Sequence, residues 1–322
     1  MNNETVCAVV VTYNRKKLLT ECLEALENQT RPVDAIYIVD NASTDGTPEL
    51  LLEKGYIDAL PTTELNESLE KTLEKNNITI HYLRMLENTG GAGGFHEGVK
   101  NVYRKGYDWL WLMDDDTVVT KYSLGTLMDK ISSLNNVKIG FASSKVLWKN
   151  EIHLMNLPLV SPLLGRLPFN FYEDKGILLV KHSSFVSSLI NRHAIHDLGF
   201  PIKEFFIWGE DTEYTDRITE NGYLGLYVPE SRVYHKTKEN YSIDIYNAKI
   251  QDSWKYHLGI RNQLYIAKRH GFLSFLNALL YNLIYINWNI LKKRNNYRAR
   301  FFYINTKATL AAIFFRPKIL KD

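Results

Sequence analysis

Three consecutive aspartates, Asp114, Asp115 and Asp116, directly follow the apolar stretch Trp109–Met113. Like charges packed this closely raise one another's pKa, and a divalent cation removes that penalty. Carboxylate oxygens at the end of a buried strand are hard ligands that suit Mg²⁺ or Mn²⁺ bridging a diphosphate. A solvated acidic turn or a helix cap is the alternative. Because the preceding stretch is typical of a buried strand, we favour the metal site.

A second acidic cluster lies in a segment that reads FIWGEDTEY. Glu210, Asp211 and Glu213 stand close to Trp208 in this segment. A carboxylate beside an aromatic platform for a sugar ring is a candidate for acid or base catalysis. The alternative is a helix N-terminus, where the helix dipole favours acidic side chains.

Two further features are weaker on their own. The glycine-rich segment Asn88–Phe95 is not a P-loop, because no Gly-Lys-Ser/Thr follows, and it lacks the Rossmann placement after the first strand. Its glycines either allow a tight turn or a close backbone approach, or contact phosphate or sugar before a helix. His235 follows the strand-like run Leu224–Val228, and a lone histidine is more often structural than a ligand.

The elements that would position these residues alternate between strand and helix. Strands are predicted at Val6–Tyr13, Ala35–Val39, Ile78–Arg84 and Asp108–Met113. Helices are predicted at Lys16–Asn28, from about Pro48, and from the glycine cluster to Lys105. This alternation predicts an α/β fold with a doubly wound, mostly parallel sheet, which binds ligands beyond the carboxyl ends of its strands.

Polar clusters stand at the carboxyl ends of all four predicted strands. They are Thr12–Arg15, Asp40–Asn41, Asn88–Gly91 and Asp114–Asp116. Their shared position at one sheet edge is the first evidence for a ligand site there.

The remaining pattern is more mixed. Glu64–Asn77 is interpreted as an inserted, solvated helix. Ile139–Trp148 and Ile177–Val186 are predicted strands, separated by the proline-containing loop Leu157–Phe169. Trp254–Arg269 is a predicted helix, and we expect it to bear on the choice of substrate.

Composition excludes several classes of protein. The chain has 322 residues, of which 45% are hydrophobic, and only two cysteines. It is therefore neither a disulfide-rich module nor a zinc-cysteine protein, nor a disordered chain or a polytopic membrane protein. No basic leader precedes a long apolar core at the N-terminus, so we expect no signal peptide and a cytoplasmic location.

Charge is distributed unevenly along the chain. Trp254–Asp322 holds 13 Lys and Arg against one acid, so this segment carries +12 although the whole chain carries only +3. Such segments contact nucleic acids, anionic membranes or acidic partners. We expect two domains, 1–245 and a basic, aromatic-rich helical extension at 246–322.

The apolar run Phe272–Leu291 indicates which of these partners the basic segment contacts. Four asparagines interrupt it and Lys292–Arg294 follow it, so an interfacial amphipathic helix fits better than a spanning helix. The alternative is a helix that packs on the main domain or in a homo-oligomer interface. The apolar character of this run favours contact of the segment with lipid or protein over contact with nucleic acid.

The motifs VVVTYNR, VDNASTDGT, ENTGGAGGF, WLWLMDDD and WGEDTEY occur in this order. Together they resemble the family 2 inverting glycosyltransferases of GT-A fold, over about Val6–Lys236. NTGGAGGF with DDD and a late W-x-(D/E)-D-x-E segment is most similar to bacterial galactofuranosyltransferases, with rhamnosyltransferases as close relatives. The fold that this implies has a Rossmann-like nucleotide-binding half and an acceptor half.

The resemblance implies a role for each matching residue. Donor-binding residues would be Thr12, Asn14, Arg15, Asp40, Asn41, Asn88, Gly90, Gly91 and Asp115. Asp40 would recognise a pyrimidine base. The Mn²⁺ or Mg²⁺ ligands would be Asp114, Asp116 and His235. Asp211 would be the catalytic base, with Glu210 as the other candidate because many relatives have Asp-Asp here. Acceptor-binding residues would be Trp208 and Glu213.

The implied reaction is transfer of galactofuranose from UDP-galactofuranose to a lipid-linked or cell-envelope glycan, at the inner face of the cell membrane. A dTDP-rhamnose donor is the alternative within the family. Nucleotidyl transfer is disfavoured because no glycine-rich, basic phosphate loop follows the first strand. A non-catalytic binding protein with a basic tail is a further alternative, disfavoured because every acid that the mechanism needs is present.

Overall fold

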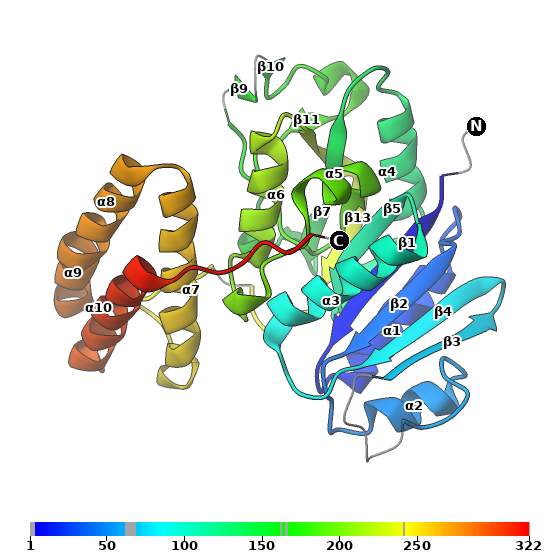
Figure 1. Cartoon of the computed structure of the whole chain (residues 1–322), viewed down its shortest axis with the longest axis horizontal. Helices are drawn as coiled ribbons and strands as arrows, with labels where there is room; N and C mark the ends of the chain where they lie inside the picture. The colour runs from blue at the N-terminus through cyan, green and yellow to red at the C-terminus, as the bar shows by residue number, and fades with distance from the viewer. Residues whose placement is uncertain (1–3, 62–68, 162, 165–166, 241, 322) are drawn as a thin grey trace.

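The computed structural model describes residues 4–61, 69–161, 163–164, 167–240 and 242–321, and its centre is a mixed sheet with helices on both faces (Figure 1). The strand order is β11-β13-β7-β12-β5-β1-β2-β4-β3. The four parallel strands of the first half are β1 (Val6–Thr12), β2 (Ala35–Asp40), β4 (Ile78–Arg84) and β5 (Trp109–Asp114). Their carboxyl ends share one edge, which confirms the predicted α/β sheet.

The second half of the sheet mixes strand directions. Its strands are β7 (Ile139–Trp148), β11 (Leu178–Leu179), β12 (Ser188–Asn191) and β13 (Leu224–His235), and β6 (Thr117–Val119) and β8 (Glu151–Ile152) pair at its margin. A separate hairpin is formed by β9 (Leu163–Leu164) and β10 (Leu167–Pro168). Because β12 is antiparallel to both β5 and β7, it joins the two halves of the sheet.

Alternate side chains of β1 enter two apolar cores, one on each face of the sheet. Val10 lies in the core with helix α1, whereas Val9 lies in the core with helix α3. The helices of this body are α1 (Lys16–Glu27), α2 (Thr47–Glu53), α3 (Gly90–Lys105), α4 (Ser123–Ser132), α5 (Arg192–Leu198) and α6 (Glu210–Glu220). Short 3₁₀ turns occur at η1 (Leu154–Asn156), η2 (Glu173–Lys175), η3 (Lys203–Phe205) and η4 (Ile250–Asp252).

Two secondary-structure predictions are wrong. Residues 69–75 of the predicted helix Glu64–Asn77 form strand β3 (Leu69–Lys75), which pairs antiparallel with β4; residues 62–68 lie outside the described residues. Exposure alternates with period two along β3, as at the edge of a sheet. The predicted strand Ile177–Val186 is only two residues long as β11. Beyond it, the N–H of Lys181 donates to the carbonyl of Leu159, and Thr215 hydrogen-bonds the backbone N–H and C=O of Ser183.

The C-terminal residues form a group of helices beside the body (Figure 1). They are α7 (Ser253–Arg269), α8 (Phe272–Leu280), the π-helical segment η5 (Tyr281–Ile286), α9 (Asn287–Lys293) and α10 (Arg298–Phe314). The chain then returns to the body, where the backbone N–H of Phe200 donates to the carbonyl of Leu320 at 2.9 Å. Within the described part of the chain, no helix combines the length and apolar character needed to cross a membrane.

Candidate active site

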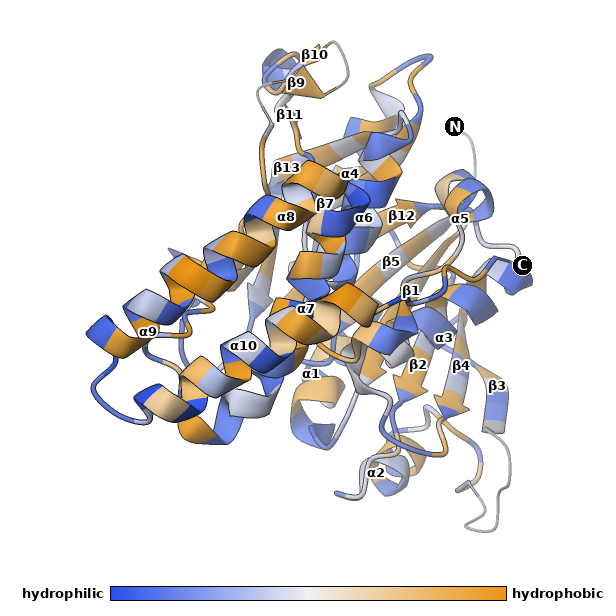
Figure 2. Cartoon of the chain, turned by 60° about the vertical axis from the view of Figure 1, so that its left-hand side comes forward, coloured by the Kyte–Doolittle hydropathy of each residue, from blue (hydrophilic) through white to orange (hydrophobic). Residues whose placement is uncertain are grey.

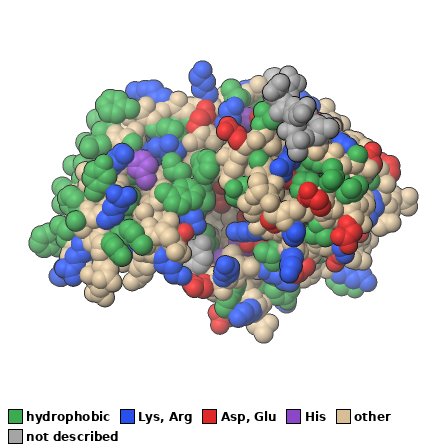
Figure 3. Space-filling model, turned by 90° about the horizontal axis from the view of Figure 1, so that it is seen from below, with side chains coloured by type: hydrophobic (Ala, Val, Ile, Leu, Met, Phe, Trp, Pro, Cys, Tyr) green, Lys and Arg blue, Asp and Glu red, His purple; other side chains and the backbone are tan. Residues whose placement is uncertain are grey.

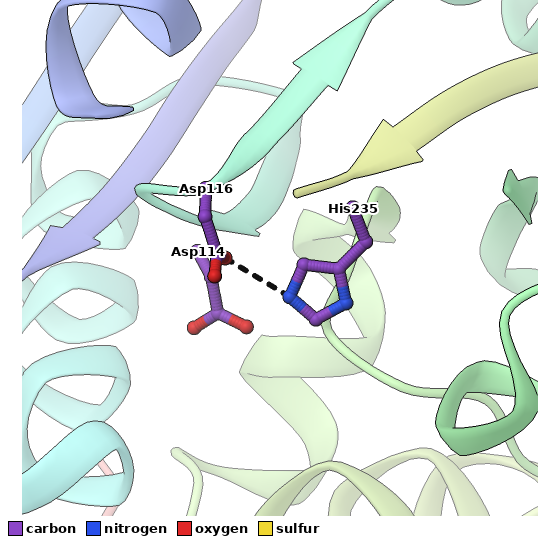
Figure 4. A group of neighbouring side chains, drawn as sticks. All are labelled: Asp114, Asp116 and His235. Carbon is purple, nitrogen blue, oxygen red and sulfur yellow. Dashed lines mark ion pairs between the residues drawn. The ribbon is translucent and has the colours of Figure 1, made fainter. Parts of the chain in front are cut away.

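Strand pairing brings His235 to the aspartates at the end of β5. Strand β6 follows Asp116 directly and pairs antiparallel with β13, so that Thr117 lies opposite His235. The imidazole Nε2 of His235 lies 2.9 Å from Oδ1 of Asp116 (Figure 4). One ligand atom each from Asp114, Asp116 and His235 lies within 4.8 Å of the others. Two carboxylates and an imidazole fit Mn²⁺ or Mg²⁺ as ligands.

Asn156 orients the imidazole of His235, and sequence reasoning missed this residue. Its Oδ1 lies 2.9 Å from Nδ1 of His235, and its Nδ2 donates to Oγ of Ser184 at 2.9 Å. Nε2 forms an ion pair with Asp116, which raises the pKa of His235. If a metal were bound, a proton kept on Nδ1 toward Asn156 would leave the Nε2 lone pair free to ligate it. The asparagine is 79 residues from the histidine, and nothing in its sequence neighbourhood indicates the contact.

The three aspartates differ in their electrostatics. Burial raises the pKa of Asp114 to about 6, and the charge of Asp116 adds to the rise. Burial raises the pKa of Asp115 to about 7. Burial alone would also raise the pKa of Asp116, but its hydrogen bond with His235 lowers that pKa below the ordinary value. Ionisation of Asp114 and Asp115 is therefore costly despite the nearby Arg15 and His235, and a divalent cation would lower that cost.

Residues that follow β1 hold Asp115 and Asp116. Thr12 donates from Oγ1 to Asp115 at 2.8 Å, and this carboxylate is almost fully buried. Arg15 places Nη1 2.6 Å from Oδ2 of Asp116 and 3.3 Å from Oδ1 of Asp115. The guanidinium is half exposed, so it remains accessible to an anionic ligand. The structure thus brings these two predicted donor residues to the cluster of Asp114, Asp116 and His235.

Glu210 and Asp211 begin helix α6. Burial raises the pKa of Glu210 to about 8, and the charge of Asp211 adds to the rise. Burial also raises the pKa of Asp211, although its Oδ1 accepts a hydrogen bond from the N–H of Thr212 at 2.6 Å. Asp211 contributes to the raised pKa of Asp114, so the helix terminus and the metal-ligand cluster interact electrostatically. A carboxylate with a raised pKa is suited to accept a proton.

The loop that leads into α6 has a strained backbone. Phe206, Trp208 and Gly209 have φ angles of 65°, 64° and 99°, in the left-handed region that aromatic residues rarely adopt. Nδ2 of Asn262, in α7, lies 2.9–3.0 Å from the carbonyl oxygens of Phe205, Ile207 and Trp208. A fully buried asparagine of the C-terminal helices therefore holds the loop that leads into α6, a role that sequence reasoning did not assign.

The glycine cluster packs against this same loop. Gly90 begins α3 with a φ of +72°, and a Cβ atom there would lie 2.0 Å from the carbonyl oxygen of Phe206. A Cβ atom on Gly91 would lie 3.4 Å from Oε1 of Glu210. The close-approach interpretation of these glycines therefore holds.

Three asparagines predicted to bind donor also hold the loops at the sheet edge. Asn41 donates to Oδ1 of Asn88 at 3.1 Å and to the carbonyl of Gly90 at 2.9 Å. Asn14 accepts from the N–H of Thr44 at 2.6 Å. These contacts fix the loops after β1, β2 and β4 relative to one another.

Asp40 is fully buried and accepts hydrogen bonds from three groups. They are the N–H of Ser43 at 2.8 Å, the hydroxyl of Tyr82 at 2.8 Å and the guanidinium of Arg84 at 2.5 Å. Ser43 and Arg84 also line a pocket of about 380 Å³ at this edge. Asp40 positions Arg84 beside the pocket, and sequence reasoning missed this arginine.

The two predicted acceptor residues have different surroundings. Trp208 belongs to the loop that leads into α6, and it lines an open pocket between this loop and helices α7 and α8. Glu213 is fully buried and forms ion pairs with Arg217 at 2.9 Å and with Arg269 at 2.5 Å. Its carboxylate thus links α6 to α7.

Comparison with known proteins identifies relatives along most of the chain. Identity is 28% over 227 residues with galactofuranosyltransferase GlfT1 of Mycolicibacterium smegmatis, covering 69% of this chain and 67% of that protein. It is 26% over 234 residues with GlfT1 of Mycobacterium tuberculosis, covering 68% and 66%. The chain therefore spans about two thirds of the length of these curated relatives.

Solved structures share the fold at 16% sequence identity. GalNAc-T7 with UDP, GalNAc and Mn²⁺ has a TM-score of 0.59 and covers 97% of this chain and 56% of that one. Staphylococcus aureus TarS 1–349 in complex with UDP has a TM-score of 0.53, with 96% and 81% covered. The mannosyltransferase PcManGT from Pyrobaculum calidifontis, with GDP-Man and Mn²⁺, has a TM-score of 0.51, with 96% and 74% covered. These similarities establish a GT-A fold.

The family model described as Glycosyl transferase family 2 matches residues 7–198. The match contains β1, β2, β4 and β5 and the three aspartates that follow β5. Because it covers more than half of the chain, the protein belongs to glycosyl transferase family 2 and is a glycosyltransferase.

Proposed function

We propose that the protein transfers galactofuranose from UDP-galactofuranose to a lipid-linked or cell-envelope glycan, at the cytoplasmic face of the membrane and with inversion. The observation that carries the proposal is the position of Asp211, at the N-terminus of α6 and in electrostatic contact with the Asp114, Asp116 and His235 cluster. The similarity to two mycobacterial galactofuranosyltransferases supports the choice of donor.

In this mechanism Asp211 accepts the proton of the acceptor hydroxyl during a single in-line displacement. Asp114, Asp116 and His235 would hold Mn²⁺ or Mg²⁺, which supplies positive charge to the leaving nucleoside diphosphate. Arg15 offers further positive charge beside the same cluster. The pocket beside Arg84, at the carboxyl ends of β2 and β4, would receive the nucleoside.

The test is binding and hydrolysis of UDP-galactofuranose, UDP-galactopyranose, UDP-glucose and dTDP-rhamnose by the full chain in Mn²⁺. We expect the strongest response with UDP-galactofuranose. A response to dTDP-rhamnose alone would overturn the donor and leave the mechanism in place. Absence of binding to every donor would overturn the proposal as a whole.

A further inference from the structure

An apolar pocket of about 490 Å³ lies between helices α7 and α8 and the loop of residues 205–209, which leads to Asp211 and is called the catalytic loop below. Its apolar walls are formed by Trp208, Tyr256, Ile260, Leu264 and Ala278. None of the described residues that line it is charged. Gln263 and Asn282 add two amide side chains to these apolar walls. A site for a sugar ring needs several converging polar groups, so this mostly apolar pocket is better suited to a hydrocarbon.

The pocket adjoins the loop that leads to Asp211. Trp208 stands three residues before Asp211, and its ring packs edge-on against Tyr256 with centroids 5.1 Å apart. A Cβ atom on Gly259 would lie 2.7 Å from the indole, so only glycine permits this approach of α7 to the tryptophan. Nδ2 of Asn262 fixes the carbonyl of the same tryptophan. A chain bound against this wall would therefore have its polar end near Asp211.

The helical segments α8, η5 and α9, which contribute Ala278 and Asn282 to the pocket, also carry exposed apolar side chains. Phe272 and Leu273 are 75% and 73% exposed, and Ile284 and Trp288 are each 66% exposed. Figure 2 shows this apolar character along α8, and Figure 3 shows hydrophobic side chains gathered over the C-terminal helices, next to a hollow in the same face. Residues 271–321 include nine Lys or Arg and no acid. Such a surface complements a membrane with anionic lipid headgroups.

We propose that this pocket binds the hydrocarbon chain of a lipid-linked acceptor, a conclusion that rests on the proposed glycosyl transfer. The chain passes from the bilayer under α8 and lies between Trp208 and Ala278, which places its headgroup sugar at Asp211. Each methylene that leaves water strengthens binding by about fourfold. Affinity therefore depends on chain length until the pocket is full.

The probe is hexadecyl phosphate with a diazirine at the end of its chain, photolysed with the full protein in the presence of UDP and Mn²⁺. The peptide that contains Tyr256 and Ile260 is expected to carry the label, and unlabelled hexadecyl phosphate is expected to compete for it. Label confined to the exposed residues Phe272 and Leu273 would overturn the proposal, because it would show adsorption at the surface alone.

Ala278→Phe tests the same pocket by filling it, and Ala299→Phe adds an identical side chain at an exposed position of α10. We expect at least a tenfold loss of hexadecyl phosphate affinity for Ala278→Phe and no loss for Ala299→Phe. Equal affinities of the two variants would overturn the proposal. Circular dichroism reports whether each variant is folded, and labelling of the unaltered protein is an independent test.

The donor panel measured on the unaltered protein separates the two proposals. Donor hydrolysis without binding of hexadecyl phosphate would overturn the proposal that the pocket binds a hydrocarbon chain, and it would leave the enzyme assignment intact. Chain binding without a response to any donor would overturn the proposed glycosyl transfer, and with it the conclusion that the chain belongs to an acceptor.

Discussion

Gly90 and Phe206 meet backbone to backbone: a Cβ atom on the glycine would lie 2.0 Å from the phenylalanine carbonyl oxygen. The N–H of Ala92 donates to the same oxygen at 3.2 Å. The N-terminus of α3, which belongs to the parallel half of the sheet, thus supports the loop that leads to Asp211. The donor side and the acceptor side of the proposed site are therefore built as one unit.

Substitution of Gly90 by alanine is expected to damage the site beyond the cost of its backbone conformation. Gly55 has the same φ of +72° but no atom within 4 Å of its Cβ position, so Gly55→Ala is the matched control. Left-handed strain alone costs about 1–2 kcal/mol. We expect Gly90→Ala to lose more stability than this in urea unfolding, and at least about tenfold in kcat/KM. Equal losses in the two variants would contradict the contact.

Asn262→Ala is expected to lower kcat more than it changes donor KM. The substitution removes the amide group that donates to the carbonyls of Phe205, Ile207 and Trp208, at a cost of about 1–3 kcal/mol. The loop before Asp211 then relaxes from its strained conformation. Asn289→Ala, which removes one hydrogen bond to Tyr285 far along the C-terminal helices, is the control and should keep full activity. Unchanged kcat in Asn262→Ala would show that the loop keeps its conformation without the hydrogen bonds of Asn262.

Chelation by EDTA should abolish sugar transfer, and Mn²⁺ or Mg²⁺ should restore it. Because Asn156 orients the imidazole of His235, Asn156→Ala is expected to weaken Mn²⁺ binding by about 10- to 100-fold. His235→Ala should weaken it further. Titration of the protein with Mn²⁺ measures both effects. Full activity in chelator, or unchanged Mn²⁺ affinity in both variants, would argue against the metal assignment.

The sequence patterns predicted the parallel half of the sheet because its strands are buried, β-branched runs that end in polar clusters. The resemblance placed His235 with Asp114 and Asp116, and the pairing of β6 with β13 explains how it reaches them. The roles of Asn156 and Asn262 could not be predicted from the sequence, because they arise from contacts between distant segments. Both are ordinary asparagines in the sequence.

The wrong secondary-structure predictions also arise from contacts between distant segments of the chain. Residues 69–75 are rich in Glu, Lys and Leu, which favour helix, but an edge position beside β4 gives them strand geometry. The predicted helix Trp254–Arg269 is confirmed as α7. The sequence could not indicate that Asn262 reaches into the catalytic loop, or that Arg269 pairs with Glu213.

Amide substitutions are expected to separate the two carboxylates at the start of α6. Asp211→Asn should lower kcat by roughly 10²- to 10⁴-fold while donor binding is retained, because it removes the general base. Glu210 has a pKa of about 8 and is mostly protonated at pH 7, so Glu210→Gln replaces it with a neutral group of the same size. We expect that variant to stay within a few-fold of full activity. The reverse pattern would move the base to Glu210.

The pH dependence of transfer should follow the ionisation of Asp211. Burial raises the pKa of this carboxyl above the ordinary aspartate value of about 3.9, so it keeps its proton to a higher pH than an exposed aspartate. A general base acts only when deprotonated, and kcat/KM should therefore fall as pH falls through the raised pKa. The profile is measured at saturating Mn²⁺, because protonation of Asp114, with a pKa of about 6, would otherwise release metal in the same range. A rate that stays constant down to pH 4 would exclude a buried aspartate as the base.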